Sequence, residues 1–82
     1  MNVWLNGEFI EIDAAKVSAF DAGFQHGVGV FETMRAAKGR VLDLDDHLQR
    51  MSDSAKALRL SERMRLEPLA EVVVQTLKRS GL

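Results

Sequence analysis

One flank of a predicted helix collects side chains that can bind a charged ligand. Successive residues of a helix are rotated by about 100°, so residues 43–58 place an apolar stripe on one side. This stripe consists of Leu44, Leu48, Met51, Ala55 and Leu58. The opposite side, which we expect to face solvent, carries Asp46, Gln49, Asp53 and Lys56. The flank between the two sides carries His47, Arg50 and Ser54.

Arg50 is the residue of this flank with the most distinctive chemistry. A boundary guanidinium can lay its stem on apolar surface and present five N–H donors in a rigid fork. A carboxylate or a phosphate is the natural ligand of such a fork. The alternative is a boundary arginine that is paired with a nearby carboxylate of the chain itself. The helix alone leaves both interpretations open.

A second row of functional side chains lies on a predicted strand, Val30 to Ala36. Strand side chains alternate between two faces, so Phe31, Thr33 and Arg35 share one face and Val30, Glu32, Met34 and Ala36 share the other. The first face suits a pocket wall for a substrate with an apolar side chain and a carboxylate. Alternatively, Arg35 sits at a sheet edge or reaches an acid such as Glu32 or Asp43.

The elements that must position these residues can be read from turn and helix signals. Asn6-Gly7 predicts a type I′ hairpin between Val3 to Leu5 and Glu8 to Ile12. Lys38-Gly39 predicts a second tight turn, with a return strand over Arg40 to Leu44, and Asp43 is suited to cap the following helix. A second helix has Pro68 in its first turn, Gly81 at its end and an apolar stripe made of Leu69, Val72, Val73, Thr76 and Leu77.

These elements predict an α+β fold. We expect one antiparallel sheet, made from the hairpin and the strand pair, with two helices packed on one face. Between the two strand pairs, Gly23, Gly27 and Gly29 indicate either unusual backbone angles or the close approach of a ligand or another chain. Their spacing does not fit a dinucleotide-binding or Walker loop.

Composition restricts the function classes. The chain has 82 residues, 46% of them apolar, and a single proline, which predicts one small globular domain. Its net charge of -1 gives no preference for nucleic acid or an anionic membrane. With no cysteine and two separate histidines, no metal site is expected. No signal-peptide or membrane-spanning pattern is present, so the expected location is cytoplasmic.

Three segments together point to a family. VWLNGEF, KVSAFDAGFQHGVGVFETMR and KGRVLDLDDHLQRMSDSAKAL, in this order, resemble the N-terminal domain of the fold-type IV (class IV) aminotransferases, which use pyridoxal 5′-phosphate. That family includes branched-chain aminotransferases, D-amino acid transaminases and aminodeoxychorismate lyases. The resemblance runs from Val3 to at least Leu60 and implies that residues 1–82 form the small N-terminal domain. Ala22 and Val28 depart from the common pattern, where arginine and often aspartate stand, so the subfamily stays open.

The resemblance implies a role for several individual residues. Arg50 matches the arginine that holds the phosphate of the cofactor. Phe31 matches the aromatic residue that lines the substrate pocket, and Arg35 matches a position that borders the pocket in branched-chain enzymes. His26 falls where those enzymes often carry an aromatic residue, and faces either the substrate or the partner subunit of a homodimer.

The implied activity is transfer of an amino group between an amino acid, with a branched-chain substrate favoured, and a 2-oxo acid. It needs a Schiff-base lysine and an acid that pairs with the cofactor's ring nitrogen, both of which belong to a second, larger domain in the family. No lysine here matches (Lys16, Lys38, Lys56 and Lys78), so the chain should carry no catalytic residue, be a fragment and not transaminate alone. Two rival functions remain: a non-catalytic interaction module, and a small-anion-binding domain using Arg50 and Arg35.

Overall fold

The N-terminal hairpin forms as its turn sequence predicts. In the computed structural model, which describes residues 1–60 and 64–81, β1 (Asn2–Leu5) pairs antiparallel with β2 (Glu8–Glu11). Asn6 and Gly7 have φ angles of 51° and 95°, the two positive values that a type I′ turn requires. A short 3₁₀ helix, η1 (Ile12–Ala14), follows the hairpin.

The second strand pair is much shorter than the sequence predicts. Only β3 (Ala36–Ala37) and β4 (Arg40–Val41) pair, around a turn in which Lys38 and Gly39 have φ angles of 53° and 74°. The predicted strand from Val30 to Ala36 is therefore wrong over residues 30–35, which do not form a strand: the carbonyl of Arg35 accepts one hydrogen bond from the N–H of Leu42 at 2.8 Å, and residues 30–34 have no ladder partner in the described part of the chain. Residues 30–35 still keep the predicted alternation, because Val30, Glu32 and Met34 are half-buried and the residues between them are exposed.

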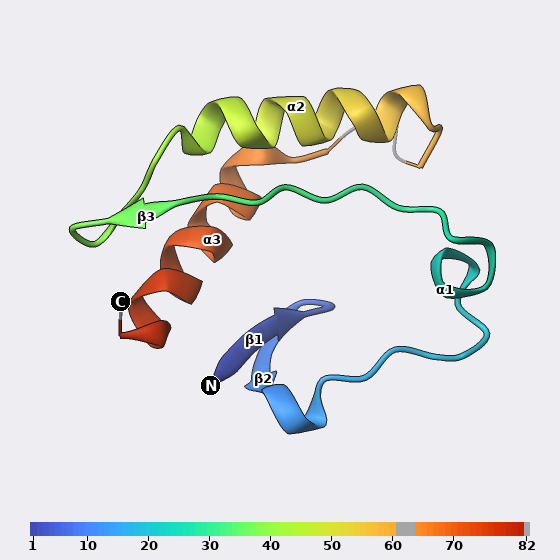
Figure 1. Ribbon diagram of the computed structural model, residues 1–82, viewed down its shortest axis with the longest axis horizontal. Coiled ribbons are helices and arrows are strands. Elements are labelled where there is room, and N and C mark those ends of the chain that lie inside the picture. The colour runs from blue at the N-terminus through green and yellow to red at the C-terminus, as the bar shows by residue number, and fades with distance from the viewer. Residues whose placement is uncertain (61–63, 82) are drawn as a thin grey trace.

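The α+β class is confirmed, but the four strands do not join into one sheet. They form two separate two-stranded antiparallel sheets. Without a ladder along residues 30–34, no backbone hydrogen bond among the described residues links the edge of β1 to the second pair. Figure 1 shows the consequence: the green segment that leads to β3 runs at a distance from the blue hairpin.

Three α-helices complete the described chain: α1 (Ala22–His26), α2 (Leu44–Ala57) and α3 (Leu66–Ser80). The predicted solvent face of α2 is exposed, and its stripe is buried at Leu48 and Ala55 but exposed at Leu58. Ser52 is buried beside the stripe, which the apolar pattern alone did not indicate. The stripe of α3 is half-buried along its length, as predicted.

The ends of the helices follow the sequence only in part. Asp43 precedes α2 as expected, but its φ of 54° is left-handed and its side chain makes no capping hydrogen bond. A capping side chain normally belongs to an extended residue, so the predicted Asp43 cap is wrong. Gly81 ends α3 with a φ of 77°, as its position predicts. Pro68 lies in the first turn of α3, although the helix begins two residues earlier, at Leu66.

The glycine-rich segment shows one predicted use of glycine, a left-handed backbone angle, and a close approach of the chain to itself, while the approach of a ligand or another chain stays a prediction. Gly27 ends α1 with a φ of 65°. At Gly23, a β-carbon would lie 2.9 Å from the Asp21 carboxylate and 3.0 Å from the Val28 carbonyl oxygen, so the backbone approaches too closely for a side chain. The Asp21 carboxylate itself accepts a hydrogen bond from the backbone N–H of Phe24 at 3.2 Å and caps α1.

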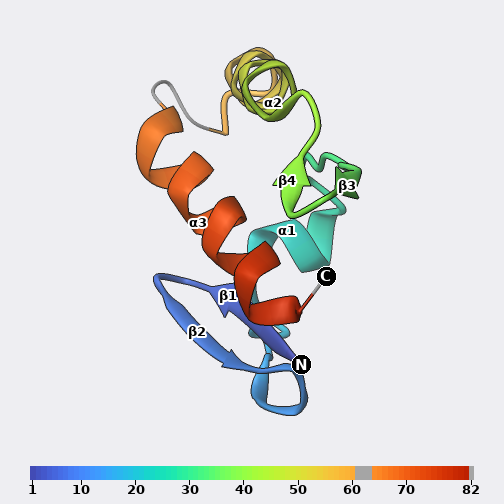
Figure 2. The same ribbon diagram turned by 90° about the vertical axis from the view of Figure 1, so that its left-hand side faces the viewer.

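Helix α3 connects the parts of the molecule. It contacts α2, β1 and β4, and Figure 2 shows it crossing between α2, seen end-on, and the hairpin. At its C-terminal end the guanidinium of Arg79 lies 4.1 Å from the ring centre of Phe9, and its Nη1 donates to the Asn2 side chain at 3.4 Å. These contacts fasten the hairpin to the last turn of α3.

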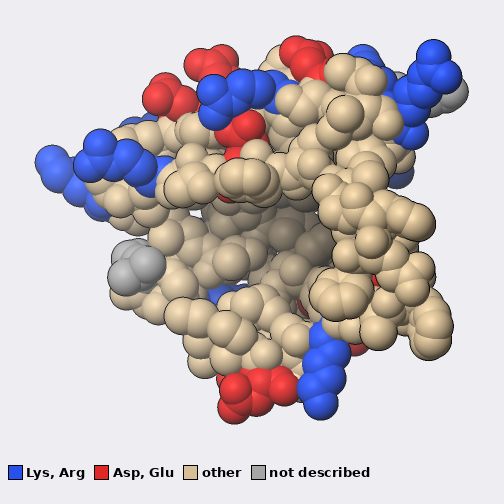
Figure 3. All heavy atoms as spheres, turned by 45° about the vertical axis from the view of Figure 1, so that its right-hand side comes forward, with Lys and Arg blue, Asp and Glu red and all other residues tan. Residues whose placement is uncertain are grey.

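The fold is open for its size. Its accessible surface is 6799 Å², whereas a compact protein of 9.1 kDa exposes about 4,900 Å². In the described ranges, only Leu48 and Ala55 are fully buried apolar residues, while Phe20, Phe24 and Phe31 are largely exposed. Figure 3 shows a hollow between the upper and lower parts of the molecule, walled mainly by uncharged side chains. The core is therefore thin, as the chain length predicts.

Candidate functional site

Glu32, His47 and Arg50 form a hydrogen-bonded cluster. One carboxylate oxygen of Glu32, Oε1, lies 2.6 Å from Nη2 of Arg50 and 2.6 Å from Nδ1 of His47. The other oxygen, Oε2, accepts a hydrogen bond from Nε of Arg50 at 2.9 Å. The carboxylate thus holds the guanidinium through two parallel bonds, the strongest arrangement for this pair of groups.

Two elements bring these three residues together. His47 and Arg50 lie three positions apart on α2, so their side chains are neighbours on one flank of the helix. Glu32 comes from the extended segment that leads to β3 and passes beside α2 (Figure 1), and the alternation of buried and exposed residues along this segment turns its side chain inward. The side chain of Glu32 is only 7% exposed, whereas that of Arg50 is 67% exposed. The cluster therefore has a buried end, the carboxylate of Glu32, and a solvent-facing end, the guanidinium of Arg50.

The electrostatics favour the ionised forms of this pair. Hydrogen bonds from Arg50 and then from His47 lower the pKa of Glu32 from 4.5 to about 2, against a smaller opposing effect of burial. The same contact with Glu32 raises the pKa of Arg50. At neutral pH Glu32 is a carboxylate and Arg50 is a cation.

The lowered pKa predicts a stability loss in acid. Because the folded protein binds the proton of Glu32 less well than the unfolded chain does, the stabilisation is complete above pH 4.5 and disappears as the pH falls to about 2. Urea unfolding of the protein and of a Glu32→Gln variant, measured from pH 7 to pH 2, isolates this contribution. The difference in unfolding free energy between them should shrink over that window. A difference that stays constant down to pH 2 would contradict the pairing.

Part of the Arg50 fork is left for another ligand. Nε and Nη2 bind Glu32, and no partner of Nη1 is recorded within residues 1–60 and 64–81. Arg50 also lines a cavity of about 190 Å³, together with Asp43, Asp46 and His47. No lysine of the described chain lines this cavity. A cationic group that is fixed on one edge and open on the other can receive an oxyanion.

The structure does not bring the other predicted site residues to Arg50. Phe31 and Arg35 lie on the exposed side of their segment, opposite Glu32, with Phe31 85% exposed. His26 is exposed at the end of α1. No ion pair of Arg35 with Glu32 or Asp43 is present among the described residues. Among the four predicted site residues, Arg50 is thus the one that belongs to a polar cluster.

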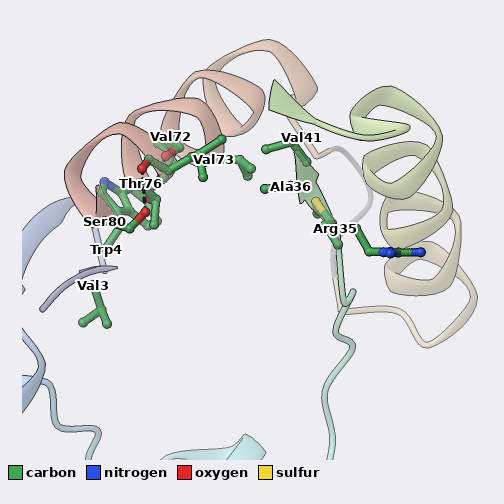
Figure 4. Close-up of a pocket in the computed structure, with 11 residues that line it drawn as sticks. Val3, Trp4, Arg35, Ala36, Val41, Val72, Val73, Thr76 and Ser80 are labelled. Atoms are coloured by element: carbon green, nitrogen blue, oxygen red, sulfur yellow. Dashed lines mark hydrogen bonds between the residues drawn. The ribbon is translucent and has the colours of Figure 1, made fainter. Parts of the chain in front are cut away.

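Arg35 borders a different cavity, an apolar groove of about 430 Å³. The groove lies between β1, α3 and the second strand pair, and Figure 4 shows the lining residues on its two sides. Val3, Trp4, Val72, Val73 and Thr76 stand on one side, and Ala36 and Val41 on the other. The charged end of Arg35 extends away from the other lining residues (Figure 4). The groove is therefore an apolar surface with its cation turned outward.

The pairing of Glu32 with Arg50 and His47 was not predicted. The sequence suggested Glu32 only as a partner of Arg35, and His47 only as a neighbour of Arg50. A signal was present, because alternation placed a carboxylate on the inward face beside Val30 and Met34, and a carboxylate on such a face needs a cationic partner. The alternative that Arg50 pairs with a carboxylate of its own chain is thus observed.

Comparison with known proteins settles the family. A model of the family described as amino-transferase class IV matches residues 29–82, which include the whole Glu32, His47 and Arg50 cluster. This chain belongs to the class IV aminotransferases. The predicted resemblance is confirmed.

Several curated class IV proteins resemble the chain. It is 43% identical, over all 82 residues, to a Methanocaldococcus jannaschii protein provisionally named a branched-chain-amino-acid aminotransferase, and covers 28% of that protein. It is 38% identical to a D-alanine aminotransferase of Staphylococcus haemolyticus, over 93% of the chain and 27% of the relative. It is 34% identical to an aminodeoxychorismate lyase of Bacillus subtilis, over 93% of the chain and 26% of the relative.

These class IV relatives show how much of such a protein the chain covers, but not which substrate it uses. The chain spans about a quarter of the length of these relatives. Their names divide among the same three activities that the sequence motifs left open.

None of the helices in the described residues of this class IV chain combines the length and the apolar character that a membrane span needs.

Proposed function

We propose that residues 1–82 form the N-terminal domain of a pyridoxal 5′-phosphate-dependent aminotransferase, in which Arg50 holds the phosphate of the cofactor. The observation that carries the proposal is the guanidinium of Arg50, which is fixed on one edge by Glu32 and belongs to a side chain that is 67% exposed. Membership of class IV supports it, because the matched segment contains this cluster.

The residues present fit one part of a phosphate site. Arg50 supplies permanent positive charge and the free N–H donors of Nη1, which suit phosphate oxygens. Asp43 and Asp46, which line a cavity together with Arg50, oppose an anion there, so the phosphate would approach from the solvent side of Arg50. One arginine does not surround a phosphate, and further donors would come from another domain or chain.

The chemistry of transamination would also depend on groups from elsewhere. When bound, the cofactor supplies an electron sink for the α-carbon of the amino acid. The four lysines of this chain lie outside the cluster, so the lysine that moves the α-proton belongs to the larger domain that we propose follows in the complete enzyme. The part of this chain is to bind the phosphate and to border the substrate.

The substrates we propose are an amino acid and a 2-oxo acid. Phe31 and Arg35, on the same face of their segment, would border the pocket for an apolar side chain and a carboxylate, with His26 facing the substrate or a partner subunit. A branched-chain substrate is favoured by the M. jannaschii relative, and D-alanine transfer or aminodeoxychorismate cleavage by the other two. The exposed Phe20, Phe24 and Phe31 support a homodimer, in which a second subunit covers apolar surface.

The test compares two ligands that differ only by the phosphate. The protein is titrated with pyridoxal 5′-phosphate and with pyridoxal, and binding is followed by equilibrium dialysis. A phosphate site predicts at least tenfold tighter binding of the phosphorylated ligand, because only that ligand forms charge-assisted bonds with Arg50. Equal binding of the two ligands would contradict the proposal. Equal retention of inorganic phosphate and the cofactor would instead support a small-anion-binding domain.

A further inference from the structure

We propose that Glu32 is a positioning residue, which orients the guanidinium of Arg50 so that its open edge can receive an oxyanion. The proposal rests on the proposed phosphate role of Arg50 and adds to it the group that makes the arginine ready to bind. It concerns an acidic residue, whose charge by itself would oppose anion binding.

The contacts of Glu32 define the plane of the guanidinium. Its two oxygens engage Nε and Nη2 of Arg50, at 2.9 Å and 2.6 Å, so the edge shared by these two nitrogens is occupied. Two parallel bonds to a planar group fix both its direction and its rotation. The edge that carries Nη1 is then held in one orientation.

Glu32 can act as a fixed point because it is itself held. Its side chain is 7% exposed, and Oε1 also contacts Nδ1 of His47 at 2.6 Å. Arg50, by contrast, has a long side chain that is 67% exposed and would otherwise sample many rotamers. Ordering such a side chain at the moment of binding costs free energy, and Glu32 removes part of that cost in advance.

Charge and positioning predict opposite effects for the loss of Glu32. Replacing it by glutamine removes one negative charge next to Arg50, so Coulomb attraction alone predicts tighter binding of phosphate. It also replaces a strong bidentate acceptor by an amide with one acceptor oxygen, so positioning predicts weaker binding. Whether phosphate binding becomes tighter or weaker in the variant therefore distinguishes the charge effect from the positioning effect.

The experiment titrates the 82-residue protein with inorganic phosphate and follows the ¹⁵N–¹H signals of the arginine side chains. The Glu32→Gln variant should bind phosphate about tenfold more weakly than the unmodified protein, the lower end of the losses seen when groups that support metal ligands are removed. Its Arg50 Nε–H signal, protected by Glu32 in the unmodified protein, should exchange faster with water. A merely structural pairing would lose this protection as well, so the exchange rate confirms that the contact is gone, and the phosphate affinity, which a merely structural role would not weaken in a folded variant, tests positioning.

The matched control is Asp46→Asn. Asp46 lines the same cavity as Arg50, and its replacement removes the same charge. No contact of its carboxylate with the guanidinium is recorded in the described residues, so phosphate binding should stay equal or become tighter. A second variant, Glu32→Asp, keeps the charge but shortens the side chain by one methylene, and should also weaken binding. It serves in place of Glu32→Gln if that variant does not fold.

The outcomes separate this proposal from the one on which it rests. Weaker binding by both Glu32 variants, with the control unaffected, supports positioning. Equal or tighter binding by either folded Glu32 variant overturns positioning and leaves Arg50 as a phosphate residue. An unmodified protein whose Arg50 signals do not respond to phosphate overturns the phosphate role, and positioning with it.

Discussion

Replacing Leu48 by alanine should lower the free energy of unfolding by about 2–4 kcal/mol, the usual cost of truncating a buried leucine. Leu48 is 1% exposed and is the largest fully buried side chain in the described residues. A chain of this length has a total stability of only about 4–12 kcal/mol, and the open fold places this one at the lower end. The variant should therefore be largely unfolded under conditions in which the unmodified protein is folded.

Leu58 offers a matched control for Leu48. It belongs to the same predicted stripe of α2, and Leu58→Ala makes the same chemical change at a side chain that is 54% exposed. It should cost less than about 1 kcal/mol, since little apolar area returns to water. Urea unfolding followed by the fluorescence of Trp4, the single tryptophan, measures both variants. Equal losses would mean that the core does not lie at Leu48.

Replacing Arg50 by alanine should weaken binding of pyridoxal 5′-phosphate by at least about tenfold, because charge-assisted bonds to the phosphate are lost. Binding of pyridoxal, which has no phosphate, should change little. The substitution also leaves the carboxylate of Glu32 with His47 as its remaining recorded partner, so the variant should be tested for folding by circular dichroism.

Arg40→Ala controls for the general loss of positive charge. Arg40 is exposed on β4 and has no recorded contact with the cluster within the described ranges. Its replacement should leave the binding of both ligands within about twofold, since exposed charges at a distance are screened by salt. If Arg50→Ala and Arg40→Ala behave alike, or if Arg50→Ala keeps its affinity within twofold, Arg50 does not hold the phosphate.

Local signals in the sequence predicted local structure well. Asn6-Gly7 and Lys38-Gly39 make the predicted turns because few dipeptides accept two positive φ angles. The period of 3.6 residues in α2 located Leu48 and Ala55 in the core. The family motifs, which combine several segments, identified class IV before any geometry was known.

Predictions that depended on distant parts of the chain were less successful. A strand needs a neighbour to become part of a sheet, and residues 30–34 have none among the described residues, although their side chains alternate as predicted. The bond between Glu32 and Arg50 spans 18 residues and two elements, so no local pattern contains it. The left-handed backbone of Asp43 likewise prevented a cap that its residue type favours.

The contacts of Arg79 with Asn2 and Phe9 have a consequence for synthesis on the ribosome. They join residues up to 77 positions apart, so the hairpin cannot make these contacts until the last turn of α3 has also emerged from the exit tunnel. During translation the nascent hairpin stays without these contacts while the intervening residues are made, since long-range contacts close only afterwards. The hairpin is thus made well before the contacts that fasten it to the last turn of α3 can form.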